Sequence, residues 1–151
     1  MAESECQISI RDRGIEQLPF AATGPKNEIT DETTRLNELV QIWHRCSTLM
    51  HRTCESAGIR YFHFLQSNQY LPDSKPLSSQ ELKTAVTKNS IYREWVEKGY
   101  PALKQDGDKL VDEGVSFFDL TMAFSASHET VYIDDCCHFG TAGNEILADA
   151  I

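Results

Sequence analysis

The amino-acid sequence predicts an α/β fold, a sandwich of helices around a mostly parallel sheet. Helical periodicity and short apolar runs typical of strands alternate along the chain, which is the pattern of βαβ units. A single glycine joins the first long helix to the strand that follows it. The length of 151 residues and a hydrophobic fraction of 40% suit one domain with one core. Three strands are visible, fewer than a typical sheet contains, so the chain is expected to be the later part of such a fold.

The first long helix is predicted to begin at Thr30 and to end at Gly58. Thr30 supplies a capping hydroxyl, the next two residues place carboxylates near the positive end of the helix dipole, and Gly58 suits a C-terminal cap. Residues 1–29 show no sustained period and are interpreted as an irregular N-terminal arm before a domain over residues 30–151. Apolar residues recur at three- and four-residue steps and predict one buried stripe. They are Leu36, Leu39, Val40, Trp43, Cys46, Met50 and Cys54.

Residues 59–65 are aromatic and β-branched, and they predict the first strand. Beyond a proline-containing loop, Ser78 and Glu81 stand three apart, which is the spacing of a capping box that starts a helix. The next helical stretch covers residues 90–111, and Pro101 is expected to divide it into two pieces.

The last third of the chain adds two strands and a helix. Residues 115–120 predict a strand, and residues 131–133 predict a shorter one. Residues 142–151 alternate like a helix with one apolar face. The order of elements favours parallel pairing, because helices separate the strands.

The charge balance argues against several classes of partner. With 14 basic and 23 acidic residues the net charge is −9, which argues against a nucleic-acid binder and against docking to an anionic membrane. No apolar run approaches the roughly 20 residues of a membrane-spanning helix, and the polar start is not a signal peptide. Five cysteines at irregular spacing do not form a disulfide pattern and favour a reducing, cytoplasmic compartment. The sequence leaves the oligomeric state open.

Asp135 and His138 are the candidate catalytic residues. They closely follow a predicted strand, where α/β enzymes hold reactive groups, and one turn could bring the carboxylate to Nδ1 of the imidazole. Asp134 is the rival carboxylate, but its offset by one residue should direct it elsewhere. The simpler alternative is a loop carboxylate near a surface histidine. Cys136 and Cys137 lie between the two, yet adjacent ligands in one turn rarely complete a tetrahedron, so no metal is expected.

The run from Tyr132 to Asn144, YIDDCCHFGTAGN, resembles the last sequence block of the SGNH/GDSL hydrolase superfamily. In that block Asp135 matches the aspartate of the catalytic triad, and His138 matches its histidine. The resemblance implies a partial flavodoxin-like three-layer sandwich with a mostly parallel sheet. Three earlier stretches are similar to one bacterial-type subgroup: residues 65–70 (LQSNQY), 74–77 (SKPL) and 117–121 (FFDLT).

The resemblance also implies a serine hydrolase that cleaves a small acyl or acetyl ester through an acyl-enzyme, with no metal or organic cofactor. His138 would accept the proton of the nucleophilic serine, and Asp135 would orient His138. The family's Gly-Asp-Ser block, which holds that serine, does not occur in this sequence. The chain is therefore interpreted as a C-terminal fragment of such an esterase, inactive on its own. The alternative is a non-catalytic α/β module that binds or scaffolds.

Asn68, Gln69 and Tyr70 are weaker candidates, for substrate binding. They lie on a loop directly after a predicted strand, at the end of a parallel sheet where ligands bind. Their polar groups could equally satisfy the backbone of the loop. The sequence leaves both possibilities open.

Overall fold

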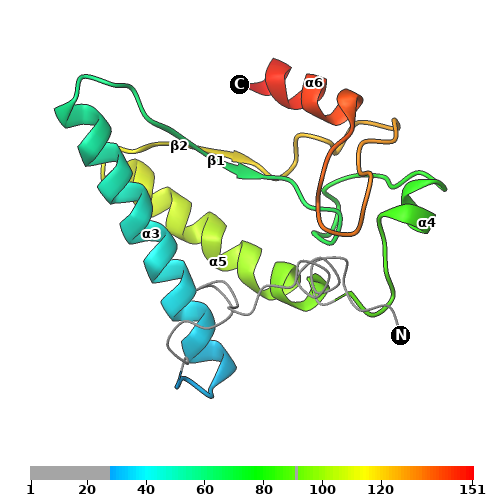
Figure 1. Ribbon diagram of the computed structural model, residues 1–151, viewed down its shortest axis with the longest axis horizontal. Helices are drawn as coiled ribbons and strands as arrows, with labels where there is room; N and C mark the ends of the chain where they lie inside the picture. Colours follow the sequence, from blue (N-terminus) through cyan, green and yellow to red (C-terminus); the bar gives the residue numbers. More distant parts are fainter. Residues whose placement is uncertain (1–27, 91) are drawn as a thin grey trace, which may run out of the picture. The chain divides into compact units, whose positions relative to one another are not determined.

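The computed structural model describes residues 28–90 and 92–151, so the arm predicted over residues 1–29 lies almost wholly outside the described residues. The chain divides into two units, residues 1–32 and 33–151. No helix among the described residues is long and apolar enough to cross a membrane. The described elements, in chain order, are α3 (Glu32–Ser56), β1 (Phe62–Gln66), α4 (Glu81–Thr84), α5 (Arg93–Asp112), β2 (Ser116–Leu120) and α6 (Thr141–Ala150) (Figure 1).

β1 and β2 form a small parallel sheet, paired along the full length of both strands. α5 lies between them in the chain and makes the crossover that parallel strands require. Helices cover one face: the ring of Trp43 in α3 lies 4.6 Å from that of His63 and 5.9 Å from that of Phe117. Gly107 of α5 also lies against Phe117. The prediction of an α/β fold with a parallel sheet packed against helices is confirmed at this level.

The other face of the sheet carries three phenylalanines, which we call the aromatic face. The ring centroid of Phe64 lies 6.4 Å from that of Phe62 and 5.4 Å from that of Phe118. Phe62 and Phe118 are 45% and 46% exposed. Parallel sheets are normally covered on both faces, so the aromatic face is incompletely covered for a sheet of this kind.

The buried stripe predicted for α3 is partly wrong. Leu39 and Met50 are 50% and 53% exposed, and Cys46 is exposed as well. Ser47 is buried instead, because its hydroxyl lies 2.6 Å from Nδ1 of His63 in the sheet below. This polar contact lies beside the packing of Trp43 on the sheet, and hydrophobic periodicity does not detect such a contact.

α5 runs unbroken from Arg93 to Asp112, which corrects the division predicted at Pro101. A proline inside a helix removes the hydrogen bond to the carbonyl four residues earlier, here that of Glu97. Glu97 and Pro101 are both exposed, so water can satisfy this carbonyl. The helix therefore tolerates the proline at this position.

Residues 131–133 do not form the third strand that the sequence predicts. They make an isolated antiparallel bridge, between Tyr132 and Phe139. The backbone N–H groups of Val131 and Tyr132 both donate to the carboxylate of Glu81, at 3.0 and 3.1 Å. A side chain thus takes up the donors that a neighbouring strand would otherwise use.

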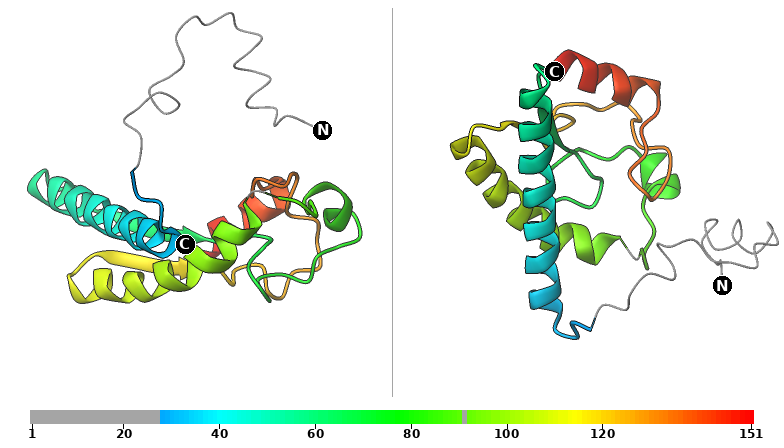
Figure 2. Two further views of the ribbon diagram at one scale, coloured as in Figure 1. Left: turned by 90° about the horizontal axis from the view of Figure 1, so that it is seen from below. Right: turned by 60° about the vertical axis from the view of Figure 1, so that its left-hand side comes forward.

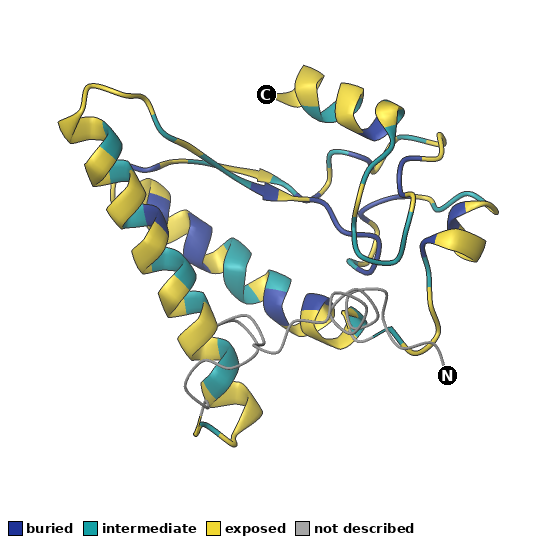
Figure 3. Ribbon diagram, in the orientation of Figure 1, coloured by how far each residue is buried: buried dark blue, intermediate teal, exposed yellow. Residues whose placement is uncertain are grey.

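A hydrophobic cluster lies beyond the C-terminal ends of the strands, in a part of the chain rich in loops (Figure 2), and further buried residues lie on α5 and β1 (Figure 3). We call residues 67–87 and 121–147 the loop region, and the two strands with α3 and α5 the sheet layer. The fully buried members of this cluster are Ala85, Phe124, Val131 and Tyr132. The partly buried residues packed against them are Leu77, Ala123, Phe139, Ile146 and Leu147.

Candidate active site

The candidate residues lie in a tight hairpin over residues 131–140, which we call the site hairpin. Ile133 donates its backbone N–H to the carbonyl of His138 at 3.1 Å, and Gly140 donates to that of Val131 at 2.8 Å. The turn between them contains Cys137 in the left-handed region, with a φ of 74°. That conformation is costly for a residue with a side chain, so it persists because the surrounding hydrogen bonds hold the turn.

Asp134 is the carboxylate that contacts His138. Nδ1–H of His138 donates to Oδ2 of Asp134 at 2.6 Å. The other oxygen, Oδ1, accepts the backbone N–H groups of Cys136 at 2.9 Å and of His138 at 3.3 Å. Burial raises the pKa of Asp134, but the hydrogen bonds from His138 and from the backbone outweigh burial, and the pKa lies below its ordinary value. An ionised carboxylate therefore holds the proton on Nδ1 and leaves Nε2 as the acceptor.

The structure differs here from the expectation that Asp135 would orient His138. Oδ2 of Asp135 accepts a hydrogen bond from Oγ1 of Thr87 at 3.0 Å. The cause lies in the turn, because the Asp134 carboxylate accepts the backbone N–H groups of the residues two and four positions after it, Cys136 and His138. This capping directs the Asp134 side chain toward His138 and leaves Asp135 to the loop that contains Thr87.

Asn68, Gln69 and Tyr70 are buried in the loop region, with exposed fractions of 5%, 6% and 5%. Nε2 of Gln69 donates to the backbone carbonyls of Asp134 and Ala85, both at 3.1 Å. Oδ1 of Asn68 accepts the backbone N–H of Tyr70 at 3.0 Å. In this structure Nε2 of Gln69 and Oδ1 of Asn68 support the loops, Oε1 of Gln69 is buried without a hydrogen bond, and Gln69 contacts the site hairpin directly.

Sequence reasoning found only part of the role of Glu81. Its capping box is confirmed: Ser78 N–H donates to Glu81 Oε2 at 2.7 Å, and Glu81 N–H donates to Ser78 Oγ at 3.2 Å. The same carboxylate also accepts from Nζ of Lys75 at 3.0 Å and from the backbone of Val131 and Tyr132. No local pattern in the sequence indicates a contact to residues about 50 positions away.

The Asp134–His138 pair can act as a base toward a group brought to Nε2. The His138 side chain is 66% exposed. Within residues 28–90 and 92–151, no hydroxyl or thiol is hydrogen-bonded to it. Over the same residues, no three His, Cys, Asp or Glu side chains are grouped to hold a metal ion. The geometry is therefore that of an imidazole whose Nδ1 is held by a carboxylate and which can exchange a proton at Nε2.

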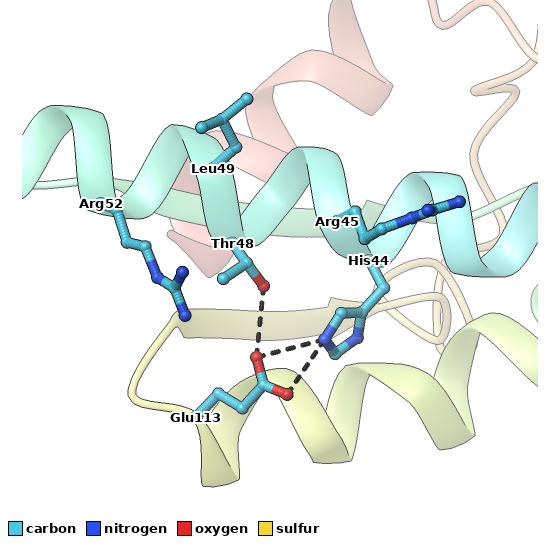
Figure 4. A pocket seen from close by; sticks show the side chains of 6 residues that line it. All are labelled: His44, Arg45, Thr48, Leu49, Arg52 and Glu113. Atoms are coloured by element: carbon cyan, nitrogen blue, oxygen red, sulfur yellow. Dashed lines mark hydrogen bonds and ion pairs between the residues drawn. The ribbon is translucent and has the colours of Figure 1, made fainter.

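A second histidine, His44, joins α3 to α5 in the sheet layer (Figure 4). Its Nδ1 lies 2.7 Å from Oδ2 of Asp106, and its Nε2 lies 3.1 Å from Oε1 of Glu113. Thr48 donates to Oε2 of Glu113 at 3.3 Å. Both ring nitrogens face carboxylates, so this histidine links the two helices. This contact borders a pocket of about 300 Å³. The pocket is lined by His44, Thr48, Glu113, Arg45, Leu49 and Arg52.

Comparison with known proteins returns no match. No family model matches the chain, and no curated protein and no solved structure matches it either. The functional interpretation therefore depends on the geometry of the site hairpin and on the sequence pattern.

Proposed function

We propose that the chain contributes the histidine base and its carboxylate to a serine hydrolase of the SGNH/GDSL type, which cleaves ester bonds. The 2.6 Å contact between Nδ1 of His138 and Oδ2 of Asp134 carries this proposal. The contact engages Nδ1 and leaves Nε2 exposed, which is the arrangement that a general base needs. The D-x-x-H run and the Gly-Asn pair after it support the same class of enzyme.

His138 is the base in this proposal. Its Nε2 would accept the proton of a serine hydroxyl as that oxygen attacks the ester carbonyl, and would then return the proton to the leaving alcohol. Asp134 orients the imidazole in the conformation described, and Asp135, at the position that matches the family, competes for that role. The serine and the oxyanion hole would come from a separate segment, so the 151-residue chain alone is expected to be inactive.

A flavodoxin-like three-layer sandwich belongs to the same proposal. The parallel pairing of β1 with β2 and the crossover by α5 support it. The aromatic face supports it too, because the second layer of helices in such a sandwich would cover that face. The substrate would be a small acyl or acetyl ester, and no cofactor is required.

A non-catalytic α/β module that binds or scaffolds is the second candidate. The half-exposed rings of Phe62 and Phe118 on the aromatic face favour it. Exposed apolar patches of this kind mark interaction surfaces. This candidate predicts binding without hydrolysis.

The test adds the missing segment to the chain. The DNA upstream of the Met1 codon is examined for a frame that encodes a Gly-Asp-Ser block, and its product is co-expressed with the chain. Hydrolysis of p-nitrophenyl acetate and labelling by a fluorophosphonate are then measured. His138→Ala is expected to lower the rate by at least about 10⁴-fold. His128→Ala, at an exposed loop position, is the matched control and should retain the rate.

Two variants compare the rival carboxylates. Asp134→Asn is expected to lower the rate more than Asp135→Asn, because Asp134 makes the contact with His138. A His138→Ala protein as active as the wild type would contradict the proposal. Fluorophosphonate labelling of the chain alone would show a nucleophile within it, and an upstream region without such a block would favour the second candidate.

A further inference from the structure

We infer that Glu81 is a positioning residue for His138: its buried carboxylate holds residues 131–132 in the place from which Asp134 reaches the imidazole. As a statement about catalysis, this inference rests on the function proposed above. The positional claim concerns the site hairpin itself and can be measured without any substrate.

Both oxygens of the Glu81 carboxylate accept two hydrogen bonds each. Oε2 accepts from the backbone of Ser78 at 2.7 Å and from Nζ of Lys75 at 3.0 Å. Oε1 accepts the backbone N–H groups of Val131 at 3.0 Å and of Tyr132 at 3.1 Å. The side chains of Lys75 and Glu81 are both 0% exposed. A carboxylate in this setting has one favourable position, because any other leaves a charge or an N–H group unpaired in the interior.

The two N–H groups bound by Oε1 lie immediately before the site. Tyr132 comes two residues before Asp134 in the chain. It forms an antiparallel bridge with Phe139, the residue after His138. Ile133, between them, donates its N–H to the carbonyl of His138. A shift of residues 131–132 therefore moves both ends of the Asp134–His138 contact.

Two further contacts secure the turn of the hairpin. Gln69 donates to the carbonyl of Asp134 at 3.1 Å, and Thr87 donates to the carboxylate of Asp135 at 3.0 Å. Neither reaches the N–H groups that Glu81 binds. Glu81 accepts them with an ionised oxygen, and charge-assisted bonds are roughly twice as strong as neutral ones. Loss of the Glu81 carboxylate is therefore expected to disturb the hairpin even with these contacts in place.

The experiment measures the tautomer of His138 in Glu81→Gln, which keeps the shape of the side chain and removes its charge. Imidazole ¹⁵N shifts of the full chain are recorded at about pH 8, where a histidine is largely neutral. The wild type is expected to hold the proton on Nδ1. In Glu81→Gln the ratio of the Nδ1–H to the Nε2–H form is expected to fall by about tenfold, the effect of losing one charge-assisted bond. Asp134→Asn supplies the reference spectrum for a lost contact.

Asp106→Asn is the matched control, a carboxylate-to-amide change at a largely buried carboxylate in the sheet layer. It is expected to lower stability and to leave the His138 ratio unchanged. If Glu81→Gln does not fold, Glu81→Asp replaces it, because the shorter side chain keeps the charge but cannot span all four donors. A folded variant at position 81 with the wild-type ratio would overturn the inference. That outcome would not affect the hydrolase proposal. Conversely, if the co-expressed protein did not hydrolyse the ester, the role of Glu81 in positioning His138 would be unaffected.

Discussion

The sheet layer and the loop region are stabilised in different ways. In the sheet layer, β1 and β2 pair regularly, yet Phe62 and Phe118 on the aromatic face are 45% and 46% exposed. The loop region contains little regular structure, but Phe124, Val131 and Tyr132 are each 0% exposed there. The sheet layer is therefore closely packed on its helix side, where Leu110 of α5 is 0% exposed, and left partly open on the aromatic face, whereas the loop region packs closely with little regular structure.

Polar side chains explain how the loops pack so closely. Backbone groups cannot be buried without partners, and Glu81 and Gln69 supply partners to four of them beyond the capping box: two N–H groups and two carbonyls. Phe124 and Tyr132 then fill the interior with a T-shaped contact at 5.7 Å. The site hairpin therefore rests on residues that are fixed by hydrogen bonds, which suits a group that must keep its orientation.

The largest expected effect separates the two regions directly. Phe124→Ala is expected to lower the free energy of unfolding by about 3–5 kcal/mol, because it leaves a cavity in the fully buried core. Phe118→Ala, on the half-exposed aromatic face, is expected to cost about 1 kcal/mol. Urea denaturation measures both. Equal losses would show that the aromatic face is covered in solution.

The second effect concerns the ion pairs. Lys75→Met leaves the Glu81 carboxylate buried without its cation and is expected to cost about 3 kcal/mol. The control is Lys104→Met in the sheet layer, where the pair with Asp119 is 41% and 34% exposed. Exposed pairs contribute up to about 1 kcal/mol. Thermal or urea unfolding of both variants tests the difference, and a loss at Lys75 no larger than that at Lys104 contradicts a buried charge at Glu81.

The third effect tests how tightly the covered face of the sheet is packed. A Cβ at Gly107 would overlap the ring of Phe117, so Gly107→Ala is expected to cost about 1–3 kcal/mol. Gly99 lies in the same helix, and a Cβ there would meet Cδ1 of Leu36 at an ordinary 3.6 Å. Gly99→Ala is expected to gain up to about 1 kcal/mol from helix propensity. A tolerated Gly107→Ala would mean that α5 stands further from the sheet than described.

The smallest effect is the dependence of stability on pH. Burial raises the pKa of Glu81, but the hydrogen bonds from Ser78, Val131, Tyr132 and Lys75 outweigh burial, so the pKa lies below its ordinary 4.5. A lowered pKa in the folded state means that this stabilisation is fully present above about pH 4.5 and is lost as the pH falls through the lowered value. Urea midpoints between about pH 6 and pH 3 should therefore fall less steeply in Glu81→Gln than in the wild type. Parallel curves would contradict a stabilising role for the ionised Glu81 carboxylate.

Local sequence patterns predicted the helices and the two paired strands well, because their causes are local. Gly58 ends α3 with a φ of 69°, and the N–H groups of Gly58 and Ile59 bond back to the last turn of the helix. Such a cap depends on one glycine and its immediate neighbours. The predicted end of this helix accordingly lies close to the observed one at Ser56.

The site depends on contacts that the sequence does not display. Residues 131–133 have the composition of a strand, but Glu81 binds two of their N–H groups from about 50 positions away. The choice between Asp134 and Asp135 depends on a turn with a left-handed Cys137, and one residue of offset reverses which carboxylate meets His138. The D-x-x-H spacing and the resemblance led to His138 as a candidate, but neither could indicate that Asp134 contacts it.

The contact between Glu81 and residues 131–132 also has a consequence for folding kinetics. It joins residues about 50 positions apart, so its two hydrogen bonds cannot form until a long segment of chain has closed. Contacts of this kind are expected to form after the transition state for folding, and their loss then speeds unfolding without slowing refolding. We therefore expect the two hydrogen bonds that Oε1 of Glu81 accepts from Val131 and Tyr132 to set the lifetime of the folded hairpin.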